Sequence, residues 1–160
     1  MVFRDGKPCS PRVMSEFRLE FGIGEPLNRL KAAGLRLFVI TNQPDIARRL
    51  MDLPTLNCMN QTVMSQLAIE AIEVCPHDDR DDCCCRKPKP GMLITLAGRA
   101  SIELTRSFVI GDSWRDAQTA RAAGCAGIIL DRAYNRNDGA DYRVATLSDA
   151  AQLILETVTS

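Results

Sequence analysis

The chain is poor in histidine and has no excess of either charge. His77 is the only histidine among its 160 residues, so no histidine-based triad or proton shuttle is available beside it. Lysine plus arginine and aspartate plus glutamate each number 20, which gives a formal net charge of zero. This balance gives no electrostatic reason to expect nucleic acid or an anionic membrane as a partner. Any anion must therefore be bound by a local site.

Long apolar runs, linkers and repeats are also absent. Leu35–Ile40 is the longest strongly apolar stretch, but Arg36 interrupts it and it is far too short to span a bilayer. The first residues, Met1–Gly6, lack the apolar block of a secretory signal. No repeat, low-complexity tract or Gly/Ser linker divides the chain. We expect one domain over residues 1–160 that is a monomer and has no membrane partner.

Cysteine, by contrast, is abundant. The number of cysteines is odd, and three of them are adjacent. Neighbouring cysteines fit disulfide geometry badly, whereas thiolates near a histidine suit a metal ion. We therefore expect a reducing, cytoplasmic compartment. The seven cysteines are Cys9, Cys58, Cys75, Cys83, Cys84, Cys85 and Cys125.

Strand and helix signals alternate along the chain, which predicts an α/β fold. The expected strands are Leu35–Thr41, Ile72–Cys75, Ser107–Ile110, Gly127–Leu130 and Tyr142–Ala145. The expected helices are Glu25–Ala33, Leu56–Glu70, Gly91–Ala100, Asp116–Ala123 and a last helix with Ser148 as its N-cap. Strands separated by helices imply a three-layer, Rossmann-like α/β/α domain with a parallel sheet covered on both faces. Ligands of such folds lie beyond the carboxyl ends of the strands.

Polar residues follow the first of these strands. In Thr41-Asn42-Gln43 a hydroxyl and exposed backbone N–H groups can hold a phosphate oxygen. The alternative is that Thr41 and Asn42 only cap the turn that follows, where such residues are common. Taken alone, the motif favours the cap.

Two carboxylates follow the strand Ser107–Ile110. Asp112 emerges at the strand end, and Asp116 lies one helical turn later on the same face. Such oxygen ligands suit Mg²⁺, which prefers few carboxylates together with phosphate and water. The alternative is an N-cap aspartate followed by a solvated helix charge.

A basic segment, Arg86-Lys87-Pro88-Lys89-Pro90-Gly91, lies between the cysteines and a helix. Lys87 supplies a compact charge suited to a phosphoryl group, and Arg86 can hold a second anion by bidentate hydrogen bonds. The prolines stiffen the segment. The alternative is a solvated basic loop.

The cysteine-rich segment predicts a structural zinc site. Alternate residues of an extended segment point to the same side, so Cys75 can act with His77, and Cys83 with Cys85. Three thiolates and one imidazole leave no open position on zinc. The alternatives are free thiols or a redox switch, and Cys84 remains a possible substitute ligand. A zinc-stapled loop would place the basic segment directly after it.

Together these motifs resemble one family, the D-glycero-D-manno-heptose 1,7-bisphosphate phosphatases of the haloacid dehalogenase superfamily. The histidinol-phosphate phosphatases are similar. The resemblance covers roughly residues 22–130 and implies a magnesium-dependent phosphatase of a small sugar phosphate. It assigns phosphoryl stabilisation to Thr41 and Lys87, and substrate binding to Thr41, Asn42, Gln43, Arg86 and Lys87. It assigns Mg²⁺ to Asp112, with Asp116 supporting that site, and zinc to Cys75, His77, Cys83 and Cys85.

The family mechanism uses an aspartate nucleophile, and the resemblance does not locate it in this chain. The first family motif is an apolar strand that ends in Asp-x-Asp-Gly. Phe3-Arg4-Asp5-Gly6 would place Asp5 at the acid/base position and Phe3 at the nucleophile position. We expect instead that the motif strand lies upstream of Met1, so that the domain is truncated. Otherwise Met1–Arg4 must fill the place of that strand.

Two other functions stay open. One is a non-catalytic zinc-containing module that binds a phosphorylated sugar or a partner protein. The other is a redox sensor built on Cys83–Cys85.

Overall fold

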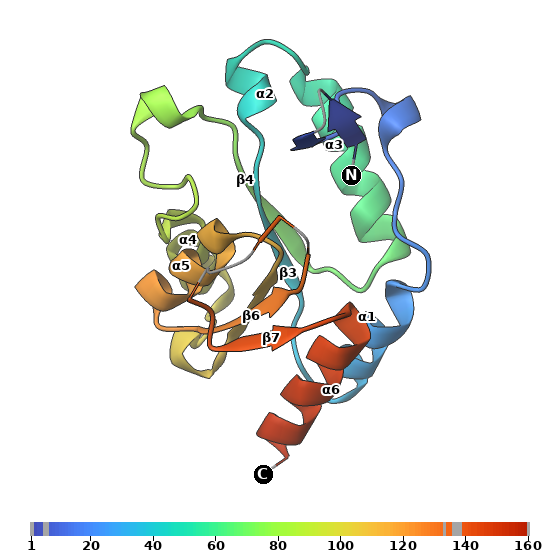
Figure 1. Ribbon diagram of the computed structural model, residues 1–160, viewed down its shortest axis with the longest axis vertical. Coiled ribbons are helices and arrows are strands. Elements are labelled where there is room, and N and C mark those ends of the chain that lie inside the picture. Colours follow the sequence, from blue (N-terminus) through green and yellow to red (C-terminus); the bar gives the residue numbers. More distant parts are fainter. Residues whose placement is uncertain (1, 5–6, 133, 136–138, 160) are drawn as a thin grey trace.

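The computed structural model describes residues 2–4, 7–132, 134–135 and 139–159, in which helices and strands alternate (Figure 1). The helices are α1 Gly24–Ala32, α2 Pro44–Ala47, α3 Leu53–Gln66, α4 Gly91–Ala100, α5 Trp114–Ala123 and α6 Leu147–Val158. The strands are β1 Val2–Arg4, β2 Lys7–Cys9, β3 Phe38–Asn42, β4 Ala71–Cys75, β5 Phe108–Gly111, β6 Ala126–Leu130 and β7 Tyr142–Val144. Within the described ranges, no helix is long and apolar enough to cross a membrane.

The strands of the expected sheet all pair in parallel, but they form two sheets. β3 pairs with β4 in one, and β5, β6 and β7 lie in that order in the other. The α/β class with parallel strands is therefore confirmed. A groove between β3 and β5 separates the two sheets.

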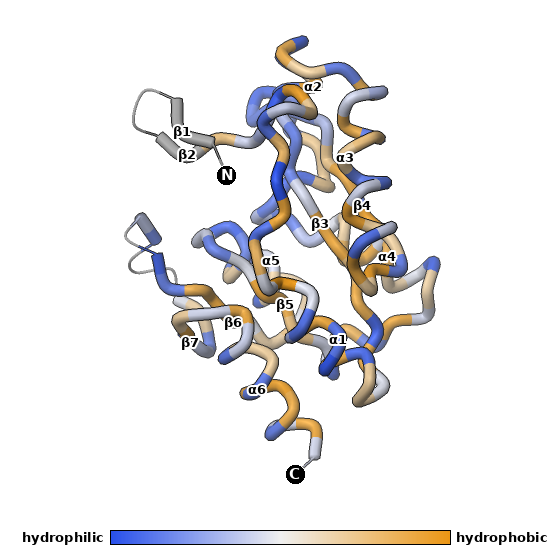
Figure 2. The backbone as a smooth tube through the Cα atoms, turned by 90° about the vertical axis from the view of Figure 1, so that its right-hand side faces the viewer, coloured by the Kyte–Doolittle hydropathy of each residue, from blue (hydrophilic) through white to orange (hydrophobic). Residues whose placement is uncertain are grey.

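The N-terminal segment does not fill that groove. β1 pairs in antiparallel fashion with β2, and among the described residues neither strand pairs with β3 (Figure 1). Figure 2 shows β3 and β4 together in one part of the molecule and β6 and β7 in another. Shortly after the hairpin, Arg12 Nε donates a hydrogen bond of 2.7 Å to Asp45 Oδ2 of α2. The alternative in which Met1–Arg4 occupies the place of a central strand is thus wrong for the described residues of that range.

One face of the sheet of β5, β6 and β7 packs on α1 and α6. Leu30 of α1 and Ile154 of α6 are almost fully buried and belong to the same cluster as Ile128 of β6. Phe108 and Ile110 of β5 also pack against this cluster. Residues two apart on a strand point to one face, so β5 presents both side chains to this layer.

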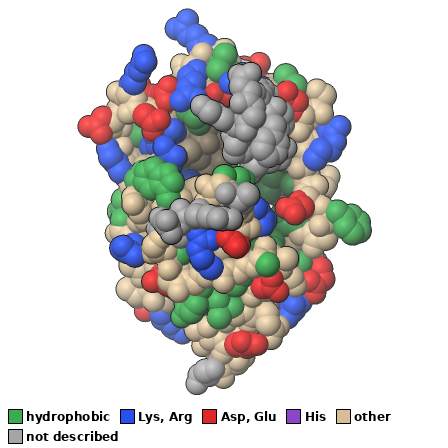
Figure 3. Space-filling view, viewed as in Figure 1, with side chains coloured by type: hydrophobic (Ala, Val, Ile, Leu, Met, Phe, Trp, Pro, Cys, Tyr) green, Lys and Arg blue, Asp and Glu red, His purple; other side chains and the backbone are tan. Residues whose placement is uncertain are grey.

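The intervening residue of β5 points to the opposite layer. Val109 is buried with Ala120 of α5 and with Cys125, and Leu93 of α4 packs against them. A third cluster, around Leu56 of α3, covers part of β4. The molecule thus has helices on both faces of its sheets, and Figure 3 shows acidic and basic side chains interspersed over one outer face.

Several element boundaries differ from the sequence expectation. The first long strand begins at Phe38 because Leu35 N bonds back to Leu30 O at the end of α1. α3 begins at Leu53, where the side chain of Asp52 caps it. The cap of α6 is Thr146, whose Oγ1 accepts from Asp149 N, so the assignment of Ser148 as N-cap was wrong.

Candidate functional site

Lys87 joins the carboxyl ends of β3 and β5. Its Nζ lies 2.6 Å from Asp116 Oδ1 and 3.3 Å from the backbone O of Ile40. Both partners of the ion pair are largely buried, with side chains 15% and 7% exposed. The two parallel strands therefore end at one place, as the sequence predicted, and a shielded ammonium group lies between them.

Asn42 fixes the backbone around this lysine. Its Oδ1 accepts a hydrogen bond of 3.0 Å from Lys87 N, and its Nδ2 donates one of 3.2 Å to Lys87 O. One amide therefore satisfies both peptide groups of Lys87. Asn42 stood among the expected substrate-binding residues, and the contact it makes in the structure is with this loop.

Thr41 and Gln43 lie beside each other at the end of β3. Gln43 Nε2 donates to Thr41 Oγ1 at 3.1 Å, which leaves the hydroxyl proton of Thr41 for another acceptor. Among the described residues, Gln43 Oε1 is buried and has no hydrogen-bond partner. Buried polar atoms are seldom left unpaired, so this oxygen is a candidate acceptor for a ligand hydroxyl.

Asp116 organises the turn after β5. Its Oδ2 accepts hydrogen bonds from Ser113 N, Ser113 Oγ and Asp112 N at 3.1, 2.8 and 3.3 Å. Residue 111, just before this turn, must be glycine, because a Cβ on Gly111 would lie 2.3 Å from the Asp116 Cβ. With Lys87 on Oδ1, both carboxylate oxygens of Asp116 are engaged inside the protein.

Two residues that the sequence did not single out contact Asp112. Tyr134 Oη donates a hydrogen bond of 2.6 Å to Asp112 Oδ2, and Asn135 Nδ2 donates one of 2.9 Å to the backbone O of Asp112. Burial, together with the neighbouring carboxylate, raises the pKa of Tyr134 to about 12, so it remains a donor at neutral pH. Both residues follow β6, at a carboxyl strand end where ligands of such folds lie. That rule is the signal by which sequence reasoning could have found them.

A cavity of about 650 Å³ opens beside Asp112. Its size suits a small organic ligand. Its wall combines the turn after β5 with the segment after β2 and the Tyr134 loop. The lining residues are Cys9, Ser10, Pro11, Asp112, Ser113, Trp114, Arg115, Tyr134 and Asn135.

The four expected zinc ligands come together. One ligand atom from each of Cys75, His77, Cys83 and Cys85 lies within 4.8 Å of all the others. The contacts along the cluster measure 3.7, 3.7, 3.3 and 3.5 Å. A tetrahedron with Zn–S bonds of about 2.3 Å has S···S edges of about 3.8 Å, so the donor set fits zinc. Cys84 is exposed and lies outside the cluster.

The thiols of this cluster have shifted pKa values. Burial raises the pKa of Cys75, and burial with hydrogen bonds from its neighbours raises that of Cys85 to about 12. Although burial opposes it, hydrogen bonds from Cys85 and from the Arg86 backbone lower the pKa of Cys83. Close thiols oppose one another's ionisation, which a divalent cation would offset.

Arg86 braces the cysteine loop. Its Nε donates to Asp79 Oδ1 at 2.7 Å and its Nη1 donates to His77 O at 3.0 Å. The pKa of Asp79 is lowered by this hydrogen bond. The turn that follows is tight, because a Cβ on Gly91 would lie 2.3 Å from Cys84 O. The expected connection between the cysteine loop and the basic segment is therefore a direct contact. The side chain of Arg86 makes it by pointing toward the loop.

One expected site residue, Asp5, lies outside the described residues. The remaining candidates form two groups. Thr41, Gln43, Lys87, Asp112 and Asp116 gather at the strand ends, while the cysteines and His77 form a separate centre that Arg86 contacts.

Comparisons with known proteins identify relatives of this arrangement. A model of the HAD-hydrolase-like family matches residues 84–157. The D-glycero-beta-D-manno-heptose-1,7-bisphosphate 7-phosphatase of Bordetella bronchiseptica is 40% identical over 107 residues, which are 64% of this chain and 60% of the relative. The corresponding phosphatase of Photorhabdus laumondii is 33% identical over 131 residues, 74% of this chain and 70% of the relative. The chain thus spans about 60% of the length of the first of these relatives.

A solved structure is similar over almost the whole chain. It is the D,D-heptose 1,7-bisphosphate phosphatase from B. bronchiseptica complexed with magnesium and phosphate. The TM-score is 0.80 at 31% sequence identity, with 91% of this chain and 88% of that chain covered.

Proposed function

Because the chain belongs to the haloacid dehalogenase-like hydrolases, in the family of the D-glycero-beta-D-manno-heptose-1,7-bisphosphate 7-phosphatases, we propose that it hydrolyses a phosphomonoester of a small sugar. The observation that carries the proposal is the meeting of β3 and β5 at Lys87. A shielded ammonium group beside a hydroxyl and a carboxylate offers the charge and the donors that a transferring phosphoryl group requires.

Within this site, Lys87 and Thr41 hold the phosphoryl oxygens. Lys87 is held in place by Asn42 and Asp116, so it needs little reorganisation to face an anion. Thr41 keeps its proton for a phosphoryl oxygen, since its oxygen already accepts from Gln43. We assign the nucleophile to none of the described residues. The family resemblance places it in an Asp-x-Asp-Gly motif.

Magnesium fits this site through Asp112. The Asp112 carboxylate lies at the end of β5. Both oxygens of Asp116 already have hydrogen-bond partners, so Asp116 supports the metal site by holding the turn that carries Asp112. A bound Mg²⁺ supplies positive charge that offsets the charge of the phosphoryl oxygens. The relative solved with magnesium and phosphate supports this assignment.

We assign structural zinc to Cys75, His77, Cys83 and Cys85. The near-tetrahedral spacing of three sulfurs and one nitrogen supports it, and a closed ligand set gives a structural role. Bound zinc would fix the loop that Arg86 contacts. It would thereby keep Lys87, the next residue, in its position at the strand ends. Zinc binding requires reduced thiols, so we also propose that the protein lies in a reducing, cytoplasmic compartment.

The substrate is proposed to lie in the cavity beside Asp112. The names of the relatives make D-glycero-beta-D-manno-heptose 1,7-bisphosphate the first compound to test.

The proposal is tested by phosphate release from this compound with the purified chain, in Mg²⁺ and in EDTA. We expect release only with Mg²⁺, and a loss of at least about hundredfold in K87M. K89M is the matched control, because Lys89 pairs with exposed Asp82 and should retain the activity. Substrate binding without release in Mg²⁺ would contradict hydrolysis and favour a non-catalytic phosphosugar-binding module.

A further inference from the structure

Asp112 is held by hydrogen bonds on three sides. Its backbone N donates to Asp116 Oδ2 at 3.3 Å, and its backbone O accepts from Asn135 Nδ2 at 2.9 Å. On the side chain, Oδ2 accepts a hydrogen bond of 2.6 Å from Tyr134 Oη. The hydrogen bonds found among the described residues leave Asp112 Oδ1 without a partner. The residue is therefore fixed in place, with one carboxylate oxygen left for a ligand.

Asn135 ties this arrangement to the end of β6. The residue is 4% exposed, and its Nδ2 also donates to the backbone O of Leu130 at 2.6 Å. Its Oδ1 accepts from Arg132 N at 2.9 Å, which closes the turn that carries Tyr134. Because the amide uses both its N–H groups and its oxygen, it has little freedom to turn. One buried amide thus sets the position from which the Tyr134 hydroxyl reaches the Asp112 carboxylate.

The number of oxygens that a carboxylate can offer matters for the choice of divalent cation. Ca²⁺ takes about six to eight oxygen ligands and binds carboxylates through one oxygen or both, whereas Mg²⁺ requires near-octahedral geometry at shorter distances. A carboxylate whose second oxygen already accepts a hydrogen bond is restricted to binding through one oxygen. This restriction suits Mg²⁺ and removes one ligand from Ca²⁺.

We propose that Tyr134 makes this site selective for Mg²⁺ over Ca²⁺, because its hydroxyl holds Asp112 Oδ2 and so prevents binding through both carboxylate oxygens. Tyr134 is a positioning residue in this role, since it acts on the cation only through Asp112. The inference rests on the proposed magnesium ligand, Asp112, and adds the residue that determines which cation this ligand accepts. Asp116 does not replace the restricted oxygen, because Lys87 and the turn after β5 occupy both of its oxygens.

A purely structural role of the Tyr134 hydroxyl predicts a different result. If its hydrogen bond only anchored the loop after β6, the loss of that bond would weaken Mg²⁺ and Ca²⁺ binding equally. The side chain of Tyr134 is at the edge of the cavity beside Asp112, and the residue is 45% exposed. Removal of the hydroxyl in Y134F therefore leaves no buried hole, and the preference between the two cations separates the two roles.

The test is competition for Mn²⁺ on the full chain, with free Mn²⁺ measured by electron paramagnetic resonance. The cysteine cluster is first filled with Zn²⁺, so that Mn²⁺ does not bind there. Mg²⁺ or Ca²⁺ is then titrated against the bound Mn²⁺, which yields the ratio of their two dissociation constants. We expect the unmodified chain to bind Mg²⁺ more tightly than Ca²⁺, and Y134F to shift this ratio toward Ca²⁺ at least about fivefold.

Two further variants serve as controls. Y142F is matched to Y134F, because Tyr142 is the only other tyrosine of the chain and is 41% exposed on β7. Y142F should leave the ratio of the two dissociation constants unchanged. D112N should remove the bound Mn²⁺, because it replaces the carboxylate that Tyr134 restricts.

Several outcomes would overturn the proposal. An unchanged ratio in Y134F, an equal shift in Y142F, or a preference of the unmodified chain for Ca²⁺ would each contradict selection by Tyr134. Equal weakening of both cations in Y134F would assign the hydroxyl to loop anchoring alone. No Mn²⁺ binding by the unmodified chain, or binding that survives D112N, would contradict the magnesium assignment as well. The ratios are measured without substrate, so a failure of phosphate release would count against the proposed hydrolysis alone.

Discussion

At the scale of single residues, the Lys87–Asp116 ion pair fixes the positions of two side chains and places opposite charges in the protein interior. Asp116 is 5% exposed, and its two oxygens are shared between Lys87 and the turn after β5. Removing one partner of a buried pair leaves an uncompensated charge, which is far more destabilising than the loss of an exposed pair. The same contact that prepares the site for an anion therefore also holds two strand ends together.

We predict that K87M lowers the free energy of unfolding by about 2–4 kcal/mol, because the Asp116 carboxylate loses its cation while it stays buried. Urea unfolding followed by circular dichroism measures the change. K89M is the control, since its pair with Asp82 is exposed and should contribute less than about 1 kcal/mol. Similar losses in both variants would contradict the burial argument.

Sequence reasoning predicted where some candidate site residues lie in the fold and missed the positions of others. Thr41, Lys87 and Asp112 could be predicted because parallel strands end at one edge of a sheet. Tyr134 could not be placed as a partner of Asp112, since its loop has no periodicity to fix its direction. The direction of Arg86 was also missed, because its partner Asp79 lies in a loop whose shape the spacing does not determine.

At the scale of elements, helix α6 depends on a cap that hydropathy does not reveal. Thr146 Oγ1 accepts from Asp149 N, and Asp149 Oδ2 accepts from Thr146 N, which forms a capping box. We predict that T146A lowers the free energy of unfolding by about 1 kcal/mol. S148A should change it by less than about 0.5 kcal/mol. The reverse order in thermal unfolding would restore Ser148 as the cap.

The zinc affinity of the cysteine loop should depend on pH. A thiol must lose its proton to bind zinc, and the raised pKa values of Cys75 and Cys85 keep both protonated at neutral pH without metal. Zinc must displace at least these two protons, so its affinity rises with pH. We predict that the dissociation constant falls at least about hundredfold per unit between pH 6 and pH 8.

Competition with a chromophoric chelator across this range measures the slope. C84S is the matched control, because Cys84 is exposed and outside the cluster, and it should bind zinc like the unmodified chain. C85S should weaken binding strongly. A flat pH profile would mean that the thiols are already ionised in the free protein.

Boundaries of elements were predicted where a local signal was strong. α4 begins at Gly91 and ends at Ala100 as expected, because prolines precede it and its apolar positions recur at helical spacing. β3 began later than expected because Leu35 continues the end of α1. The short helix α2 was missed, since four residues are too few for a periodic pattern.

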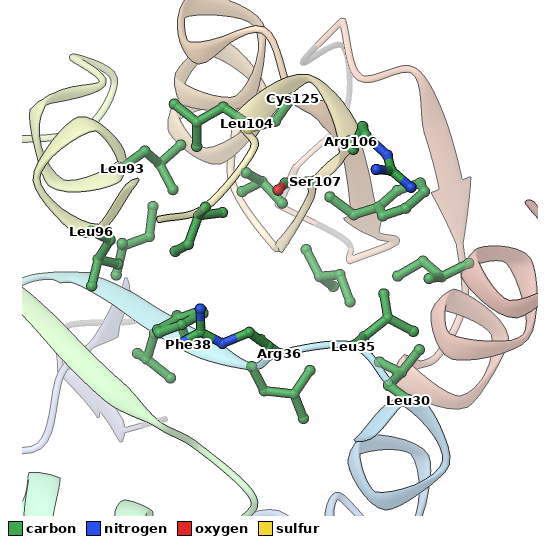
Figure 4. Close-up of a pocket in the computed structure, with 18 of the residues that line it drawn as sticks. Leu30, Leu35, Arg36, Phe38, Leu93, Leu96, Leu104, Arg106, Ser107 and Cys125 are labelled. Atoms are coloured by element: carbon green, nitrogen blue, oxygen red, sulfur yellow. The ribbon is translucent and has the colours of Figure 1, made fainter. Parts of the chain in front are cut away.

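At the scale of the whole molecule, no strand ladder among the described residues connects the two sheets, so side-chain packing and the contacts of Lys87 must hold them together. Leu30 of α1 and Ile154 of α6 share a cluster with residues of β5 and β6 and with Leu35 and Leu37, which precede β3. Sequence reasoning predicted parallel strands covered on both faces, but periodicity does not say which strands pair. The place of the gap, between β3 and β5, therefore became visible only in the structure (Figure 4).

This arrangement predicts an uneven pattern of hydrogen exchange. β6 is paired on both sides, and Ile128 and Ile129 in it are fully buried, so their amides should exchange only by global unfolding. β3 and β5 each have one edge in the groove, and the amides on that edge lack a ladder partner. We expect them to exchange at least about a hundredfold faster than those of β6. Amide-resolved exchange by NMR measures the ratio, and equal protection of all three strands would contradict an open groove in solution.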